Sequence, residues 1–308
     1  MDSKKNKIYT IATAHLDTIW NWDFEHVINV CLKETLEQNF KHFENYPTYR
    51  FNFEGAYRYE LFEEYYPEKF EELKKYIADG KWNVTGSAYE NGDVNVPSPE
   101  SLFRNILYGN RYFEKKFGKK SNDIFLPDCF GFGWALPSIM EHAGLKGFST
   151  QKLTWGSAYG RPFDIGVWYG VNGKSVFASL DSRSYCTTYK KVRDKKDISD
   201  KLKNNIKKYD FHWTFGYHGV GDVGGAPKEQ SVKTVEAEIK ANGTSDTEVL
   251  ASTPTEFFDD LSNLTKEEIS MLPTWNNELV MTNHGVGSYV SRAFSKRYNR
   301  KNEELADM

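Results

Sequence analysis

The chain has 308 residues, enough for one large domain or two smaller ones with a buried core. Its 40 lysines and arginines nearly balance 43 aspartates and glutamates, and the two signs are interspersed, so no charged surface for nucleic acid or a membrane is predicted. No apolar run approaches the roughly 18 residues of a membrane span. A small neutral substrate fits this composition better. The aromatic content of 16% suits sugar stacking as well as core packing.

The three cysteines, at positions 31, 129 and 186, are odd in number and widely spaced, with no CxxC motif. This spacing favours neither a disulfide framework nor a thiolate metal site, and a reducing compartment is the simplest interpretation. Residues 1–7 are polar and charged and show no export signal. We therefore expect a cytoplasmic protein.

Apolar patterns alternate between strand and helix from the N-terminus onward. The predicted strands are 7–14, 49–53, 82–86, 123–126, 147–150, 166–169, 175–180 and 212–216. The predicted helices are 25–44, 57–79, 100–117 (capped by Ser98), 135–143 and 228–240, with a basic, helix-prone segment at 291–307. Residues 194–197 and 242–245 are predicted to be exposed loops. Serial strand-helix units indicate an α/β fold with a parallel sheet, barrel-like or open.

Polar candidate residues lie after three of these strands. His15 and Asp17 follow the first strand, Asp128 follows the strand that ends at Leu126, and Asp222 follows the last. Because the carboxyl ends of parallel strands share one edge, these segments are the candidate site.

His15 and Asp17 are separated by one residue, so an extended strand end points both side chains to the same side. Nitrogen and oxygen ligands without thiolate suit zinc or another divalent ion. The alternative is a histidine and an aspartate that only form hydrogen bonds in a loop.

Asp128 lies among apolar and glycine neighbours, where a carboxylate is poorly solvated unless something pairs with it. A metal ion or a hydrogen-bond donor would pair with it, and such a carboxylate could serve as a nucleophile. The alternative is an acid that stabilises the N-terminus of the helix at 135–143. Asp222 lies in a glycine-rich loop that lets the backbone approach a ligand, although an ordinary turn has the same composition.

The segments taken together resemble one known family. The sequence HLDTIW at 15–20 is similar to the HxDxxW signature of glycoside hydrolase family 38, the retaining α-mannosidases. Residues 127–137 (PDCFGFGWALP) resemble its second signature. Further segments resemble the family in the same order, namely 93–102, 149–155, 221–225, 284–291 and 296–300. The resemblance covers nearly the whole chain, and bacterial members are most similar.

The resemblance implies a mechanism. His15, Asp17 and Asp128 match zinc ligands of the family, Asp128 also matches the catalytic nucleophile, and Asp222 best matches the acid/base. The implied substrate is an oligosaccharide or N-glycan with terminal α-linked mannose, cleaved through a covalent mannosyl-enzyme intermediate. Zinc is the implied cofactor, with another divalent metal as the alternative.

Three further residues match positions that contact substrate in the family. Trp20 and Phe130 match aromatic residues of the sugar subsite, and Lys152 falls where some relatives have an arginine. The alternative for Lys152 is a solvated lysine.

The resemblance also implies a domain organisation. A (β/α)7-barrel-like catalytic domain is expected at 1–271, followed at 272–308 by the beginning of a truncated helical middle domain. The family's fourth zinc ligand, a histidine, is expected from that later domain. We therefore expect weakened metal binding and little activity from this chain alone, and a possible homo-oligomer in the full-length form.

Two other functions fit the residues. Metal-dependent carbohydrate deacetylases or amidohydrolases also place His-x-Asp pairs at strand ends, and His212 and His218 could supply further ligands. A non-catalytic sugar-binding fragment is the second alternative.

Overall fold

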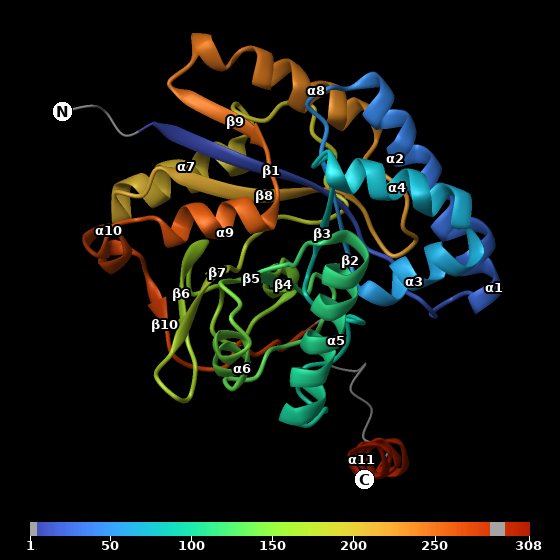
Figure 1. The fold of residues 1–308 in the computed structure, drawn as a ribbon. Coiled ribbons are helices and arrows are strands. Elements are labelled where there is room, and N and C mark those ends of the chain that lie inside the picture. Colours follow the sequence, from blue (N-terminus) through green and yellow to red (C-terminus); the bar gives the residue numbers. More distant parts are fainter. Residues whose placement is uncertain (1–4, 284–292) are drawn as a thin grey trace.

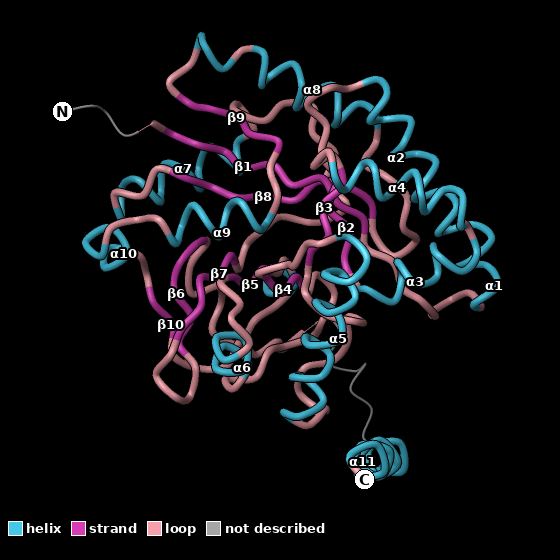
Figure 2. The backbone as a smooth tube through the Cα atoms, viewed as in Figure 1, coloured by secondary structure: helices cyan, strands magenta, loops and turns pink. Residues whose placement is uncertain are grey.

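The computed structural model describes residues 5–283 and 293–308. Strands occupy the interior and helices lie around them (Figures 1 and 2). The first sheet consists of β3 (Trp82–Thr85), β2 (Phe51–Glu54), β1 (Asn6–Ala14) and β8 (Trp213–Val220), with β9 (Thr247–Ala251) also paired to β1. The second consists of β10 (Thr274–Trp275), β6 (Ile165–Tyr169), β7 (Ser175–Ser179), β5 (Gly147–Ser149) and β4 (Asp123–Phe125).

The helices connect and cover these strands (Figure 1). They are α1 (Phe24–His26), the π-helical η1 (Val27–Leu32), α2 (Lys33–Asn45), α3 (Ala56–Tyr65), α4 (Pro67–Ala78), α5 (Pro99–Phe117), α6 (Leu136–His142), the 3₁₀ turn η2 (Lys152–Trp155), α7 (Lys196–Tyr209), α8 (Glu229–Lys240), the 3₁₀ turn η3 (Asn242–Thr244), α9 (Pro254–Ser262), α10 (Lys266–Met271) and α11 (Ala293–Asp307). None of these described helices is both long and apolar enough to cross a membrane.

β1 is the central strand of the first sheet. Its residues are buried beyond the first two, as its β-branched and small apolar sequence predicts. It pairs in parallel with β8 along its length, so that Ala14 lies opposite Val220. The ends of these two strands therefore reach the same edge of the sheet together.

Aromatic side chains fill the core between strands and helices. The largest fully buried side chains are tryptophans, tyrosines and phenylalanines, among them Trp82 and Trp168. Core packing thus accounts for much of the high aromatic content.

The α/β class is confirmed, but the closed (β/α)7 barrel is not, because strand pairing within the described residues forms two separate sheets. Between β3 and β4, side chains replace strand pairing: the Asp123 carboxylate accepts hydrogen bonds from the Thr85 hydroxyl (3.0 Å) and the Gly86 N–H (3.3 Å). At the opposite edge of the first sheet, formed by β8, a backbone hydrogen bond reaches the second sheet. The Tyr217 N–H in β8 donates to the carbonyl of Ser182, three residues after β7, at 2.7 Å.

The expectation that all strands run parallel is wrong for β6 and β7, which pair antiparallel. Five residues connect them, too few for a parallel crossover. The turn contains Asn172-Gly173, with Gly173 at φ 76°, and the Gly170 N–H donates to the Lys174 carbonyl at 2.8 Å. An Asn-Gly pair between two apolar runs is itself a hairpin signal.

Two predicted helices are each interrupted. The helix predicted at 25–44 contains the π-helical stretch η1, and the helix predicted at 57–79 is divided into α3 and α4 at Pro67. Proline lacks the backbone N–H that a continuous helix needs, and it favours the first turn of a new one.

Several elements were not predicted. α7 includes residues 196 and 197 of an expected loop, while β9, α9 and α10 fall in a region that had no assignment. In α7, Ile198, Leu202 and Ile206 recur every four residues, which is a helical spacing, so this helix could have been predicted from the sequence.

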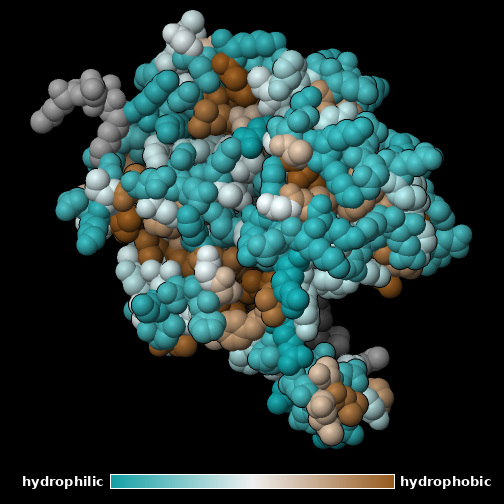
Figure 3. Space-filling view, in the orientation of Figure 1, coloured by the Kyte–Doolittle hydropathy of each residue, from teal (hydrophilic) through white to brown (hydrophobic). Residues whose placement is uncertain are grey.

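The final helix, α11, lies beyond α5 (Figure 1). Glu303 accepts hydrogen bonds from the Ser98 N–H (2.8 Å) and the Ser101 hydroxyl (2.7 Å) at the N-terminus of α5. Figure 3 shows hydrophobic residues on the surface of α11, and Phe294 and Leu305 of this helix are exposed. The motif predicted at 284–291 lies outside the described residues, and the boundary at 271/272 stays a prediction.

Candidate metal and catalytic centre

The ends of β1 and β8 place His15 and Asp17 beside Asp222. The register of the two strands continues into the loops: the His15 N–H donates to the Val220 carbonyl at 3.0 Å, and the Asp17 N–H donates to the Asp222 carbonyl at 2.8 Å. Backbone hydrogen bonds between the two loops thus bring His15 and Asp17 next to Asp222.

The Asp222 loop packs against α2 through Gly224 and Gly225. Gly224 and Gly225 have φ of 70° and 98°, and the Gly225 N–H donates to the Thr35 hydroxyl at 2.7 Å. A Cβ atom on Gly224 would lie 2.6 Å from that hydroxyl oxygen. The loop therefore requires glycine here, and Asp222 itself takes a left-handed φ of 70°.

Asp128 arrives from the second sheet. It lies in the turn after β4, where Gln151 donates from Nε2 to the Pro127 carbonyl at 3.0 Å and Thr150 donates to the Leu126 carbonyl at 2.7 Å. The turn is therefore fixed to the end of β5. The alternative of a helix-stabilising acid is not supported, because α6 begins at Leu136 with no side-chain cap and no acidic residue in its first turn.

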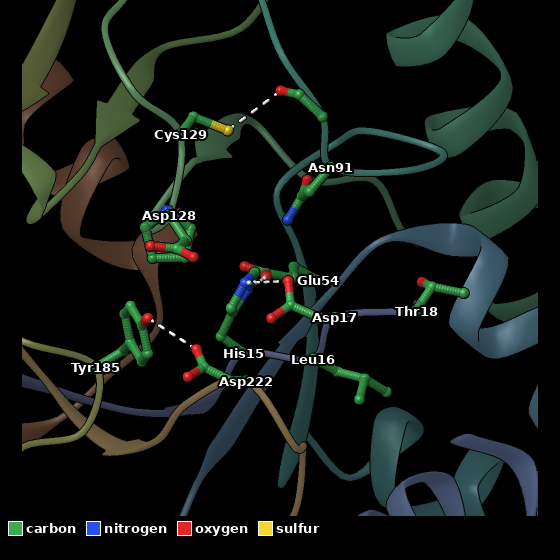
Figure 4. A network of polar contacts seen from close by, with 12 residues as sticks. His15, Leu16, Asp17, Thr18, Glu54, Asn91, Asp128, Cys129, Tyr185 and Asp222 are labelled. Atoms are coloured by element: carbon green, nitrogen blue, oxygen red, sulfur yellow. Dashed lines mark hydrogen bonds and ion pairs between the residues drawn. The ribbon is translucent and has the colours of Figure 1, made fainter. Parts of the chain in front are cut away.

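These residues form one cluster at the strand ends (Figure 4). One ligand atom from each member lies within 4.8 Å of those of all the others, the members being His15, Asp17, Asp128 and Asp222. We call these residues the four-residue cluster. Three of its members, with Phe130 and residues 91–93, line a cavity of about 280 Å³.

His15 is oriented by a residue that the sequence did not single out. Its Nδ1 lies 2.8 Å from Oε1 of Glu54, which is fully buried at the end of β2. Its Nε2 is buried 3.4 Å from Oδ1 of Asp17 without a well-formed hydrogen bond. Burial lowers the pKa of the His15 imidazole, but the Asp17 and Glu54 carboxylates outweigh it and raise the pKa to about 10.

This arrangement fits a divalent metal ion. A buried imidazole nitrogen without a good partner faces carboxylate oxygens, and the other ring nitrogen is held by a carboxylate, as is usual behind a metal-bound histidine. Nitrogen and oxygen donors suit zinc. The positions of His15, Asp17 and Asp128 are therefore compatible with their predicted role as metal ligands.

We expect Glu54→Leu to weaken zinc binding about 10- to 100-fold, because the His15 ring then loses the acceptor that orients it. Glu54→Gln, which keeps an acceptor oxygen, should lose much less. Chelator competition measures both affinities, and thermal unfolding of the metal-free variants serves as the control. Equal zinc affinity in Glu54→Leu and the wild type would show that Glu54 does not position His15.

Lys152 is not a solvated lysine. Its side chain is only 2% exposed, and its ammonium pairs with Asp128. The same nitrogen lies 4.6 Å from the ring centroid of Phe130 and 4.3 Å from that of Trp155. Lys152 and Phe130 therefore lie beside Asp128, whereas Trp20 is 59% exposed and is not among the described residues that line the cavity.

Tyr185 was also not predicted. Its hydroxyl donates to Oδ1 of Asp222 at 3.0 Å. Burial, together with Asp128 and Asp222, raises the pKa of the Tyr185 phenol, so it remains a donor at neutral pH. No motif in the sequence marks it, because it lies between elements and reaches Asp222 only in the fold.

His212 and His218, the further ligands of the deacetylase alternative, do not join the cluster. His212 contacts Asn6 at 2.9 Å and Asp210 at 3.1 Å. His218 is buried, with Nδ1 2.9 Å from the Ser231 hydroxyl. His15 is the one histidine in the cluster formed by the described residues.

His218 should make stability depend on pH. Burial lowers its pKa from 6.5 to about 3, so protonation favours the unfolded chain. The contribution of His218 to the free energy of unfolding is therefore present above pH 6.5 and is lost progressively toward pH 3, with a loss of about 2 kcal/mol at pH 5. Urea unfolding at pH 7 and pH 5 should show this loss reduced in His218→Gln but retained in the exposed control His26→Gln. An unchanged loss in His218→Gln would contradict this account.

The chain is thus an α/β protein in which one imidazole and three carboxylates, a set of side chains that could bind a metal ion, lie together at the strand ends. Residues 5–278 match the family model described as "Glycosyl hydrolases family 38 N-terminal domain". The chain therefore belongs to glycoside hydrolase family 38.

Several known proteins are similar to the chain. Alpha-mannosidase G of Dictyostelium discoideum is 33% identical over 296 residues, covering 96% of this chain and 26% of that protein. The alpha-mannosidase of Saccharomyces cerevisiae is 29% identical over 301 residues, covering 96% and 27%. The crystal structure of an alpha-mannosidase from Enterococcus faecalis V583 superimposes with a TM-score of 0.69 at 21% identity, covering 89% and 31%. The chain thus spans about a quarter of the length of these curated relatives.

Proposed function

We propose that the chain carries the catalytic centre of a metal-dependent retaining α-mannosidase that removes terminal α-linked mannose from oligosaccharides or N-glycan-type substrates. The convergence of the four-residue cluster at the strand ends carries this proposal. Membership of family 38 and the names of its relatives support it. A cytoplasmic location and a homo-oligomeric full-length form stay predictions from the sequence.

His15, Asp17 and Asp128 would hold the metal, zinc being the first choice for this donor set. A bound zinc would act as a Lewis acid that holds hydroxyl groups of the mannose ring. Glu54 keeps His15 turned toward the other ligands. Lys152, Phe130 and Trp20 are proposed to contact the sugar.

Asp128 and Asp222 are proposed as the two carboxyl groups of the retaining mechanism. Oxygen atoms of the two lie within 4.8 Å, close to the roughly 5 to 5.5 Å that separates the carboxyl groups of retaining enzymes. Asp128 attacks the anomeric carbon while Asp222 protonates the departing glycosidic oxygen. Asp222 then takes a proton from the water that releases mannose from Asp128.

The deacetylase alternative gains less support. Such an enzyme needs a water-activating metal site with further histidines, and only His15 serves the cluster among the described residues. A second carboxylate close to Asp128 has a direct role in glycoside cleavage instead.

Hydrolysis of an aryl α-mannoside by the zinc-loaded chain tests this function. Even a slow reaction suffices, provided it exceeds the background of the Asp128→Ala variant. Proton NMR should detect α-mannose as the first product, because the configuration is retained. Inhibition of mannose release by a chelator is also expected. First release of β-mannose would refute the retaining mechanism, and acetate release from N-acetylated sugars without mannose release would favour the deacetylase.

A further inference from the structure

Asn91 lines the same cavity as the ligands of the proposed metal site, yet no role has been given to it. It lies between β3 and α5, and it faces His15, Asp17 and Asp128 across the cavity. Both polar atoms of its amide, Nδ2 and Oδ1, are buried and have no hydrogen-bond partner among the described residues. Figure 4 shows the amide nitrogen of Asn91 directed toward the cluster.

The backbone that carries Asn91 is firmly held. The Glu90 N–H donates to Oδ1 of Asn105 at 3.0 Å, and Nδ2 of Asn105 donates to the Glu90 carbonyl at 2.9 Å. The Glu90 carboxylate in turn binds buried Arg58 at 2.8 Å and accepts a hydrogen bond from the Asn91 N–H at 2.9 Å. The position of the Asn91 side chain is therefore built into the loop.

The loop is also fixed to the opposite wall of the cavity. The Cys129 thiol lies 3.2 Å from the Gly92 carbonyl, and Nδ2 of Asn95 donates to the Gly131 carbonyl at 2.9 Å. The side chains of Glu90 and Asn95 thus have hydrogen-bond partners, whereas the side-chain amide of Asn91 has none among the described residues. A buried amide without partners is unfavourable unless a ligand or water completes its hydrogen bonds.

The chemistry of the amide indicates which ligand group fits. The other polar groups that line the cavity include the carboxylates of Asp17, Asp93 and Asp128, which accept hydrogen bonds when ionised. Asn91 is neutral and offers a donor and an acceptor side by side. A sugar hydroxyl has the same two capacities, whereas a carboxylate or an ammonium group offers only one.

We propose that Asn91 is a specificity-determining residue that hydrogen-bonds one hydroxyl group of the bound sugar ring. The inference deepens the proposed α-mannosidase function and rests on it. Asn91 recognises the sugar, whereas Asp128 and Asp222 act on the glycosidic bond. A sugar that lacks the recognised hydroxyl leaves the amide unpaired and binds more weakly.

The test measures binding of methyl α-mannoside and its 2-, 3-, 4- and 6-deoxy analogues to the zinc-loaded chain by NMR titration. Wild type is compared with Asn91→Leu and Asn91→Ala, and with Asn204→Leu, an exposed position on α7, as the matched control. Zinc affinity and thermal unfolding are measured for each variant, so that a change in the metal site or in folding is recognised separately.

We expect both Asn91 variants to bind the parent sugar about tenfold more weakly, with zinc affinity unchanged. One deoxy analogue should bind the wild type about tenfold more weakly than the parent sugar does. The Asn91 variants should bind this analogue and the parent sugar with equal affinity. Equal binding by wild type and variants, or the same loss for every analogue in all proteins, would overturn the inference while leaving the proposed function in place. A wild-type chain that binds no mannoside would overturn the proposed function and the inference with it.

Discussion

Replacement of Asp128 by alanine should lower α-mannoside hydrolysis by at least about 10³-fold, because it removes both the proposed nucleophile and a metal ligand. Zinc affinity should fall as well, and the ion pair with buried Lys152 is lost. Hydrolysis of an aryl α-mannoside and chelator competition for zinc measure the two effects on one preparation.

Asp93→Ala is the matched control, since Asp93 lines the same cavity but accepts a hydrogen bond from the Val96 N–H at 3.1 Å and is not a member of the cluster. Its effect on hydrolysis should stay within about tenfold. Full activity in Asp128→Ala would refute the assignment of the nucleophile.

Asp222→Asn should slow hydrolysis by about 10²- to 10⁴-fold, the usual contribution of a general acid/base. Asparagine is chosen because it tolerates the left-handed backbone of Asp222, which alanine would strain. The loss should be smaller for mannosides with good leaving groups, since these need little protonation at the glycosidic oxygen. A comparison of aryl mannosides with leaving groups of different acidity measures this dependence.

Zinc affinity separates the two possible roles of Asp222, which lies within the cluster and is close enough to bind a metal. If Asp222 is the acid/base, Asp222→Asn should leave the zinc affinity unchanged. A tenfold or greater loss of zinc affinity, with an equal slowing for all leaving groups, would instead make Asp222 a metal ligand. Tyr185→Phe provides a milder control, because it removes only the hydrogen bond to Asp222.

The sequence was informative where a strand ends in polar residues. The apolar run of β1 followed by His15 and Asp17 marks a strand end by itself, and the spacing places both side chains on one side. That Asp222 joins them follows from the pairing of β1 with β8, which connects residues about 200 positions apart. Such pairing leaves no local pattern, so the resemblance to family 38 supplied the connection.

Glu54 and Asn91 were missed for different reasons. Glu54 is the last residue of the buried strand β2, just as His15 follows the buried strand β1, so its position was a usable signal. Asn91 lies in a loop whose conformation depends on distant partners such as Arg58. The division of the strands into two separate sheets could not be predicted either. Contacts between the sheets, such as that of Asp123 with Thr85, are made by side chains and not by strand pairing.

The unassigned C-terminal helices carried clear signals. Thr253 with Glu256 and Thr265 with Glu268 form capping boxes at the starts of α9 and α10, and both follow the Thr-x-x-Glu pattern. These starts could have been predicted from the sequence. The shortness of α10, in contrast, gives too few turns for a helical apolar period.

The most direct test of the metal centre is a zinc titration of the chain by chelator competition, together with its His15→Ala and Asp17→Ala variants. We predict one zinc per wild-type chain and at least about tenfold weaker binding in each variant, because both residues contribute ligand atoms to the cluster. Absence of zinc binding by the wild type, or equal affinity in all three proteins, would contradict the proposed centre.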